Sequence, residues 1–458
     1  MTESERWLLR CAFLACAGLY LFHLYLIWKY AVDVPFMDEW ASFEPNQLPA
    51  GLSVNGLFAQ HNEHRIVTTR LLVWLLFHLN GWNLRTHQLL NFALYGLILM
   101  VSVWFVKKTA LQIPIWLILS FVVFLLSPLN WSNHFWGYQS QLHFWLLFYL
   151  ASSYYLFSDT QSWLYLVVGV AATILSTYSM AGGLVSSLVL LVMFGLFKAT
   201  RIYSVEPRKR ARDYLQLMLV AGLGGATNVM WLINYRKPVY HPPLVLPHQG
   251  QFWRYFTNIV ALGFGMDRLS LPWGLFCLFI VLAPLLGVLL SRRGGWPAGQ
   301  WRAFVPTLGV LAVLASVTAG RTGFGIEQSK ESRYFELGMS LIPLSLVGWA
   351  VFLQESKRLK AGVIAGLWVF CFFASWNGWK DFQNYQIEAL RRNAGLACLL
   401  ASYRGIAGGY CPTIYPTPIP PRILEQAKLL NASFYRGFGG GIATEAGRAS
   451  DRATGNQE

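Results

Sequence analysis

Two adjacent acidic residues follow the first hydrophobic stretch of the chain. Asp38 and Glu39 lie in the sequence MDEW, eight or nine residues after an apolar run that ends at about Tyr30. A carboxylate so close to a membrane face is partly desolvated, and it can act as a general base toward a hydroxyl or an amine. An exposed acidic pair at the membrane surface is the alternative interpretation.

A second polar cluster, HNEHR, begins at His61. On a helix, His61 and Arg65 share one face and His64 lies one turn from His61, so the two histidines and a carboxylate from elsewhere could hold a divalent metal. A second interpretation has Glu63 and the histidines orienting a sugar while Arg65 meets a phosphate. In a third, the cluster only caps and solvates the start of a helix. The zinc-peptidase pattern H-E-x-x-H is absent, so peptidase chemistry is not expected.

The third candidate site is the segment 320–334, GRTGFGIEQSKESRY, which carries Arg321, Lys330, Arg333 and Tyr334. A guanidinium at a membrane face suits a phosphate on a lipid carrier, because it binds two oxygens at once and keeps its proton. Contact with lipid headgroups, or an ion pair with Glu327 or Glu331, is the alternative. The segment 130–141, NWSNHFWGYQSQ, includes Gln139 and has aromatic residues that can stack on sugar rings, although aromatic residues also collect at any membrane interface.

The elements that must position these residues are hydrophobic. Of 458 residues, 55% are hydrophobic and 12% are charged, whereas soluble domains have about a quarter charged residues. The composition therefore predicts an all-α polytopic membrane protein. Runs of roughly 17 to 25 apolar residues can cross the hydrocarbon core. We expect about eleven transmembrane helices, at about 7–30, 87–106, 113–129, 141–157, 163–179, 182–198, 213–233, 272–290, 303–319, 335–353 and 362–378.

Basic residues predict the orientation of these spans. The formal charge of +15 comes largely from Lys and Arg in alternate loops, which the positive-inside rule explains without a nucleic-acid partner. This rule places the N-terminus inside and the C-terminus outside. The run 66–79 is short and contains Arg70 and His78, so we expect an interfacial helix within one long outer loop, 31–86. The first run is longer than a signal-peptide core and is expected to remain as an anchor.

The chain divides accordingly into a transmembrane domain, 1–378, a small outer segment, 379–436, and a Gly-rich and Ala-rich tail, 437–458, that is expected to be disordered. Helical pattern is expected at about 421–431. Cys398 and Cys411 fall in the outer segment, where an oxidising compartment would allow them to pair; two free thiols are the alternative.

An inward N-terminus, a first span, a long outer loop that opens with MDEW and contains an interfacial helix, and then many spans resemble the GT-C superfamily of integral membrane glycosyltransferases. Bacterial members with a similar HNEHR, FWGYQSQ and SRY are the nearest in pattern. Protein O-mannosyltransferases and lipid A aminoarabinose transferases share the layout.

The resemblance implies a site at the outer face of the bacterial inner membrane. Members of the superfamily place a catalytic base in the first outer loop, which maps onto Asp38, with Glu39 as neighbour or substitute. They take a sugar from a polyprenyl phosphate whose phosphate meets later outer loops, here Arg333 and also Arg321 or Lys330. The implied partners are a polyprenyl-phosphate sugar, an envelope glycan, lipid or protein acceptor, and membrane lipids. Several relatives have a second acid or a metal, for which Glu63 with His61 or His64 is the candidate here.

A transporter or flippase for a lipid-linked glycan is the alternative function. Such proteins usually carry charged residues inside their spans and often show internal repeats. The expected spans here are nearly free of charge and no repeat is apparent, which favours a reaction at the membrane surface.

Overall fold

The computed structural model describes residues 1–160, 162–202, 207–266, 271–291, 296–403 and 410–436, and within these ranges the chain is helical and contains no strand. This agrees with the all-α, multi-pass architecture expected from the sequence. The segment 437–458, expected to be disordered, lies outside the described residues.

Within the part of the chain that the structure describes, eight helical segments are long and apolar enough to cross a membrane. They comprise α1 (Glu3–Tyr30), α4 (Leu84–Thr109), α9 (Ala181–Ile202), α10 (Pro207–Leu232), α12 (Leu271–Ser291), α13 (Ala298–Arg321), α14 with α15 (Ser332–Met339 and Leu341–Phe352), and α16 (Lys357–Ser375), which continues through a 3₁₀ turn (Trp376–Phe382) into α17 (Gln383–Tyr403). The other three expected spans form shorter helices: α5 (Ile115–Leu125), α7 (Ser140–Leu156) and α8 (Trp163–Thr177). A ninth candidate arises if α5 and the segment Pro128–Phe135, bent by 43° and including α6 (Trp131–Phe135), form one broken span.

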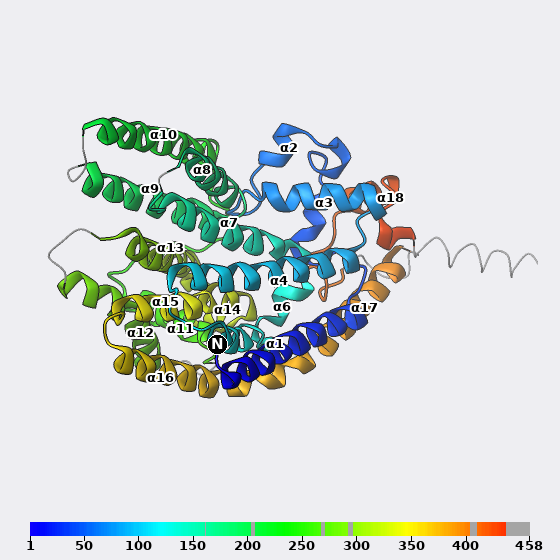
Figure 1. Ribbon diagram of the computed structural model, residues 1–458. Coiled ribbons are helices and arrows are strands. Elements are labelled where there is room, and N and C mark those ends of the chain that lie inside the picture. The colour runs from blue at the N-terminus through cyan, green and yellow to red at the C-terminus, as the bar shows by residue number, and fades with distance from the viewer. Residues whose placement is uncertain (161, 203–206, 267–270, 292–295, 404–409, 437–458) are drawn as a thin grey trace, which may run out of the picture.

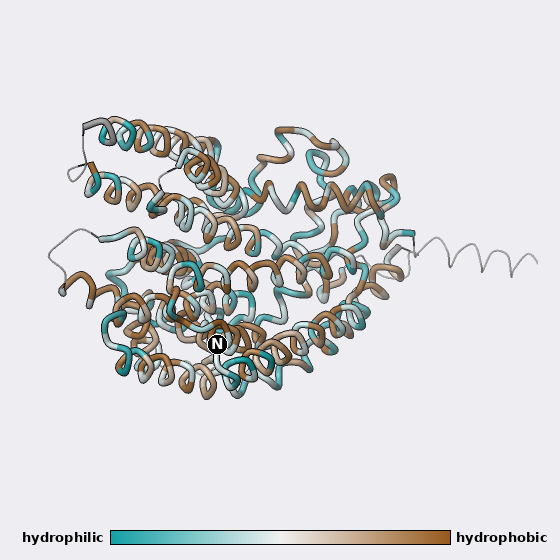
Figure 2. Tube along the Cα trace, in the orientation of Figure 1, coloured by the Kyte–Doolittle hydropathy of each residue, from teal (hydrophilic) through white to brown (hydrophobic). Residues whose placement is uncertain are grey.

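The helices are arranged with their basic ends together. The C-terminal ends of α4 and α9 and the N-terminal ends of α10 and α16 lie at the left of Figure 1, whereas α2 (Val54–Phe58), α3 (Val67–Asn80) and α18 (Pro421–Leu429) lie at the right. We call the latter the loop end of the bundle. Hydrophobic residues dominate the long helices, and hydrophilic ones concentrate toward helix ends and connections (Figure 2).

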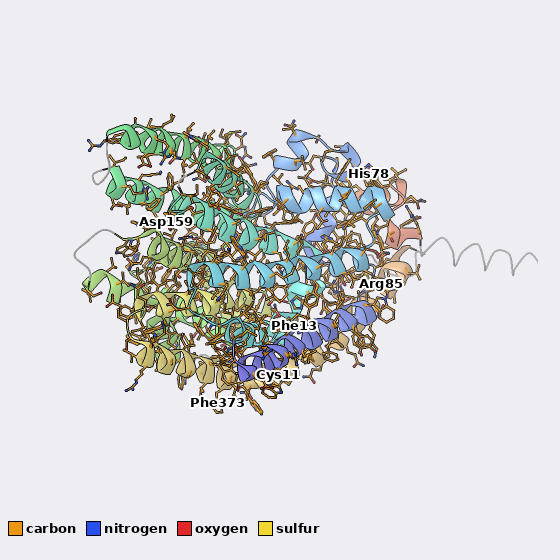
Figure 3. The ribbon with its side chains drawn as sticks, viewed as in Figure 1. Cys11, Phe13, His78, Arg85, Asp159 and Phe373 are labelled. Carbon is orange, nitrogen blue, oxygen red and sulfur yellow. A yellow bond between two sulfur atoms is a disulfide. The ribbon has the colours of Figure 1, made fainter. Side chains whose placement is uncertain are left out.

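Large apolar side chains on the bundle surface face outward. Phe13 on α1 and Phe373 on α16 are 59% and 70% exposed and lie at the surface of the bundle in Figure 3, where Asp159 marks one end and His78 and Arg85 the other. Such a surface is stable in lipid, because hydrocarbon solvates apolar side chains as well as a protein core does.

The expected interfacial helix corresponds to α3, which has 14 residues and is therefore shorter than the ~20 residues needed to span the hydrocarbon core. It ends at Gly81, whose positive φ of 72° closes the helix in the left-handed conformation. Ser433 N–H donates to the Gly81 carbonyl at 2.8 Å. The C-terminal segment is thereby joined to the first loop.

The loop end has its own hydrophobic core. The first loop contributes Trp40, Phe43 and Trp82, and the C-terminal segment contributes Ile414 and Phe434. Helix α17 runs beside α1 in Figure 1 and contacts it. The C-terminal segment therefore covers the first loop as well as packing against the transmembrane helices. The helix expected at 421–431 is α18.

Helix α11 (Gly250–Gly263) lies in the segment expected between two spans. It packs against α12 and α14 and is mostly buried. Its Gly263 meets Gly338 of α14 backbone to backbone. This close approach fixes the position of α14, which carries one side of the site described below.

Candidate functional site

A cavity of about 1240 Å³ opens among the first loop, α6 and the turn after it, α13, α14, α17 and residues 415–417. It exceeds the roughly 300–1,000 Å³ of an ordinary small-molecule pocket. Eight residues singled out from the sequence line it: Asp38, His61, Glu63, His64, Gln139, Arg321, Arg333 and Tyr334. The fold thus brings together four segments that are far apart in the sequence.

Asp38 lies on a short 3₁₀ helix, Met37–Phe43. Met37 has a positive φ of 50°, and its N–H donates to the carbonyl of Ile414 at 2.8 Å. Asp38 Oδ2 accepts from His61 Nε2 at 3.1 Å and from Asn62 Nδ2 at 3.2 Å. Its other oxygen, Oδ1, is buried and has no hydrogen-bond partner among the described residues. A buried acceptor left free is costly unless a ligand fills its place, so Oδ1 marks a binding position.

The HNEHR cluster forms a tight turn. The metal-site hypothesis assumed a helix at this position, and the cluster does not form one. His61 and His64 exchange backbone hydrogen bonds of 2.8 and 2.7 Å, and Asn62 has a φ of 50°, which asparagine tolerates better than most residues. Helix α3 begins only at Val67, after the cluster. This turn directs His61 to Asp38 and His64 to Glu63 as two separate pairs.

The His64 ring is held as a neutral imidazole. Its Nδ1 accepts the Ala181 N–H at 3.0 Å, which leaves the ring proton on Nε2, 3.5 Å from Glu63 Oε1. Burial lowers the pKa of His64. Among the described residues, no three His, Cys, Asp or Glu side chains are placed to hold one metal ion.

Glu63 forms an ion pair with Arg321 of α13, and its other oxygen lies 3.5 Å from His241 Nε2. Burial raises the pKa of Glu63, but His64, Arg321 and His241 lower it further than burial raises it, to about 2. Glu63 is therefore a carboxylate at neutral pH. The pair fixes the Arg321 side chain at the cavity wall.

Arg333 and Tyr334 begin α14 and face the cavity. Arg333 Nε lies 2.7 Å from Glu331 Oε2, and the guanidinium stands 5.1 Å from the centre of the Tyr334 ring. Arg333 therefore forms the ion pair with Glu331 that was the alternative interpretation, and it also lines the cavity. One wall of the cavity carries this cation, and the first loop carries the Asp38 carboxylate.

Three residues expected in the site lie elsewhere. Glu39 is fully buried behind the cavity, where the N–H groups of Phe36 and Tyr138 donate to its carboxylate at 2.8 and 3.3 Å. Burial raises the pKa of Glu39 to about 7 despite the nearby Arg392. Glu39 is therefore held within the MDEW turn and lies outside the cavity lining, whereas Asp38 is part of it.

Arg65 and Lys330 also fall outside the cavity lining. Arg65 is buried, and its guanidinium donates to the backbone carbonyls of Phe58, Trp231 and Ile233. Its role is to join the first loop to the end of α10. Lys330 is half-exposed and pairs with Glu327 at 2.6 Å. Lys330 ends the 3₁₀ turn Ile326–Lys330, whereas Arg333 lies in the first turn of α14, and only Arg333 is in the cavity lining.

The cavity also contains residues that sequence reasoning did not identify. Arg391 and Arg392 of α17, together with Glu388, Tyr415 and Thr417, form one further wall. The signal that could have found them is a pair of adjacent arginines in the segment 379–436, which was expected outside, where the positive-inside rule predicts few basic residues. The apolar part of the cavity is lined by Leu142, Met180, Val317 and Leu337.

The candidate disulfide is present. Cys398 of α17 is bonded to Cys411, with Cα atoms 5.8 Å apart. The bond ties the turn that contains Ile414 and Tyr415 to the wall that carries Arg391 and Arg392.

Comparison with known proteins gives no relative: no protein-family model, curated protein or solved structure matches the chain.

Proposed function

We propose that this protein is a membrane glycosyltransferase that moves a sugar from a polyprenyl-phosphate donor to an envelope glycan, lipid or protein acceptor. The observation that carries the proposal is that Asp38, whose buried Oδ1 has no hydrogen-bond partner among the described residues, lines the same cavity as Arg333. A base and a cation that line one cavity suit a reaction in which a hydroxyl loses a proton while a phosphate departs.

In the proposed reaction, Asp38 accepts the proton of the acceptor hydroxyl as that oxygen attacks the anomeric carbon of the donor. The bond between this carbon and the phosphate oxygen breaks, and the bonding electrons leave with the polyprenyl phosphate, whose charge Arg333 and Arg321 stabilise. Direct displacement inverts the anomeric centre. His61 and Asn62 hold Oδ2, so Oδ1 is the atom left to receive the proton.

The surroundings of the cavity support a lipid-linked donor. Apolar residues from the bundle, Leu142, Val317 and Leu337 among them, line the same cavity as the charged residues. A polyprenyl chain needs an apolar path and its phosphate needs a cation, and both are available here. Gln139, Trp136 and Tyr240 supply amide, indole and phenol groups that can bind sugar hydroxyls.

The proposal includes a topology of about eleven spans, with the N-terminus inside, the C-terminus outside and the cavity at the outer face of the bacterial inner membrane. Two observations support it. The helix ends next to the basic connections lie opposite the loop end (Figure 1). The Cys398–Cys411 disulfide lies at the loop end, and disulfides persist in oxidising compartments such as the periplasm.

A transporter or flippase for a lipid-linked glycan is the second candidate, and one observation favours it. The expected span 335–353 contains Glu336, whose buried Oε1 lies 2.7 Å from His143 Nε2, so the spans are less free of charge than expected. However, Asn133 and Asn91 bond to the two partners, and this cluster is at most 1% exposed. A closed, mutually bonded cluster favours a structural role over an open path for a substrate.

The decisive experiment is transfer of radiolabelled sugar from cell-envelope polyprenyl-phosphate donors by purified protein in one detergent. We expect Asp38→Asn to lose at least about 100-fold in rate, the range of one general base, and Arg333→Ala about 10-fold or more. Asp159→Asn is the matched control, because Asp159 is 69% exposed at the opposite end of the bundle. Equal rates for wild type and Asp38→Asn would overturn the catalytic assignment, and absence of transfer from every donor would favour the transporter.

A further inference from the structure

The wall that α17 contributes to the cavity contains a cation that the proposed donor site does not use. Arg392 lines the cavity although only 1% of its side chain is exposed, and its Nη1 has no hydrogen-bond partner among the described residues. A buried guanidinium N–H without an acceptor is costly. Its presence beside an open cavity indicates a position for an anionic ligand atom.

The Arg392 guanidinium is held rigidly. Its Cζ lies 4.2 Å from the centre of the Phe36 ring and 5.7 Å from that of Phe135, and Nε donates to Glu388 Oε1 at 3.0 Å. Stacking and the Nε bond together fix the plane of the guanidinium. A fixed donor fork loses little entropy on binding and favours anions with several oxygens.

Other donors line the same cavity. Arg391 is adjacent in sequence and 68% exposed, with only a long 4.0 Å approach to Glu388. The hydroxyl-bearing residues Tyr415 and Thr417 also line the cavity. Two arginines and two hydroxyls can together meet the three terminal oxygens of a phosphate monoester, whereas a carboxylate has two.

The arginines of α17 and the donor cation Arg333 belong to different elements of the cavity lining, α17 and α14. Phe36, two residues before Asp38, stacks on Arg392. On α14, Arg333 interacts electrostatically with Asp38 itself and pairs with Glu331. Asp38 is therefore near Arg333 and also near Phe36, which stacks on Arg392. The 1240 Å³ cavity exceeds the volume of a usual single-ligand pocket.

We propose that Arg391 and Arg392, with Tyr415 and Thr417, bind a phosphate monoester of the second substrate, so that the acceptor of the reaction is itself phosphorylated. This inference rests on the proposed function only in calling the second substrate an acceptor. The existence of the phosphate site does not depend on the proposed function. The phosphate belongs either to a lipid headgroup or to a water-soluble molecule.

The test measures binding to purified full-length protein in detergent by calorimetry, without any transfer reaction. The probes are dihexanoyl phosphatidic acid for a lipid phosphate and glycerol 3-phosphate for a soluble one, each titrated with and without saturating polyprenyl monophosphate. We expect at least one phosphate probe to bind in the presence of polyprenyl monophosphate. The probe that binds more tightly identifies the source of the phosphate.

Arg392→Gln is expected to weaken the phosphate probe at least about tenfold and to leave polyprenyl-monophosphate affinity within about twofold. Arg333→Gln should do the reverse. Arg391→Gln keeps the test valid if Arg392→Gln fails to fold, because Arg391 is exposed, and about a threefold loss is expected. Arg302→Gln, at the opposite end beside Asp159, is the control and should change neither affinity.

Failure of both phosphate probes to bind overturns the inference. Competition between the probes and polyprenyl monophosphate, or loss of polyprenyl-monophosphate affinity in Arg392→Gln, also overturns it, because Arg392 would then belong to the donor site. Binding as expected without sugar transfer would leave the phosphate site in place and refute only the glycosyltransferase.

Discussion

The Cys398–Cys411 disulfide is expected to hold the segment that contains Asp38 in place, although both cysteines lie outside the cavity lining. The Cys411 carbonyl accepts the N–H groups of Ile414 and Tyr415 at 3.1 and 3.0 Å. The Ile414 carbonyl in turn accepts the N–H of Met37, which precedes Asp38. Removing the disulfide in Cys398→Ser/Cys411→Ser should therefore loosen Met37 and displace Asp38.

The magnitude follows from the loop that the bond closes. The cysteines are 13 residues apart, and closing a loop of this length removes about 10 cal/mol/K of chain entropy, or about 3 kcal/mol at 25 °C. If all of this stabilises the 411–415 turn, its local opening becomes more frequent by about a hundredfold. The effect should remain local, because the bond closes a loop of only 13 residues at the end of α17.

Hydrogen–deuterium exchange with mass spectrometry measures this opening. Peptides containing Met37 and residues 411–415 should lose up to about a hundredfold in protection, whereas peptides from α4 should be unchanged. Sugar transfer should fall in parallel. Cys11→Ser is the matched control, because Cys11 is a free, exposed cysteine on α1.

Two outcomes would refute the reasoning. Less than about a threefold change in protection at Met37 would mean that packing, and not the cross-link, holds the turn. Equal loss of protection in α4 would mean that the bond stabilises the whole protein and has no specific connection to Asp38.

Three further predictions concern ionisable residues. The pKa of Glu63 is lowered from 4.5 to about 2, so the Glu63 carboxylate contributes up to about 3 kcal/mol of stability at pH values above 4.5, and this stability is lost as the pH falls toward 2. In Glu63→Gln, acid unfolding monitored by tryptophan fluorescence should therefore depend less on pH. A pH profile equal to that of wild type would contradict this prediction. Lys330→Ala should retain wild-type sugar transfer while Arg333→Ala loses about tenfold or more, since only Arg333 lines the cavity; equal losses in the same assay would return Lys330 to the site. Glu336→Ala should lower the free energy of unfolding by about 3 kcal/mol or more, because it leaves His143 buried without its partner 2.7 Å away. The double variant Glu336→Leu/His143→Leu should have a thermal unfolding temperature closer to that of wild type. A double variant less stable than Glu336→Ala would show that the unpaired His143 is not the cause of the lost stability.

The helices could be predicted because their signal is local. A run of about twenty apolar residues has few stable alternatives to a membrane helix, since a lipid-exposed backbone must satisfy its own hydrogen bonds. The signal for α3 was also local, because its apolar run is short and contains Arg70 and His78. Whether α5, α7 and α8 cross depends on helix packing, which the composition of each run does not specify.

The candidate site was partly predictable for a different reason. Charged residues next to apolar runs are few, so Asp38, Glu63, Arg321 and Arg333 attracted notice from position alone. Position did not predict burial. Glu39 is adjacent to Asp38, yet the 3₁₀ helix turns it away from the cavity toward the N–H groups of Phe36 and Tyr138.

Hydrophobicity and helix length act over single segments, so the amino-acid sequence alone specifies a helical membrane protein, the places of its apolar helices and the polar segments that connect them. Which polar residues meet follows from the folded chain. The α17 wall with Arg392 faces Asp38 because the C-terminal segment folds over the first loop, where Ile414 accepts the N–H of Met37 and Phe434 packs on Trp40. Contacts between residues nearly 400 positions apart depend on packing and hydrogen bonding in the complete fold, and no local pattern records them.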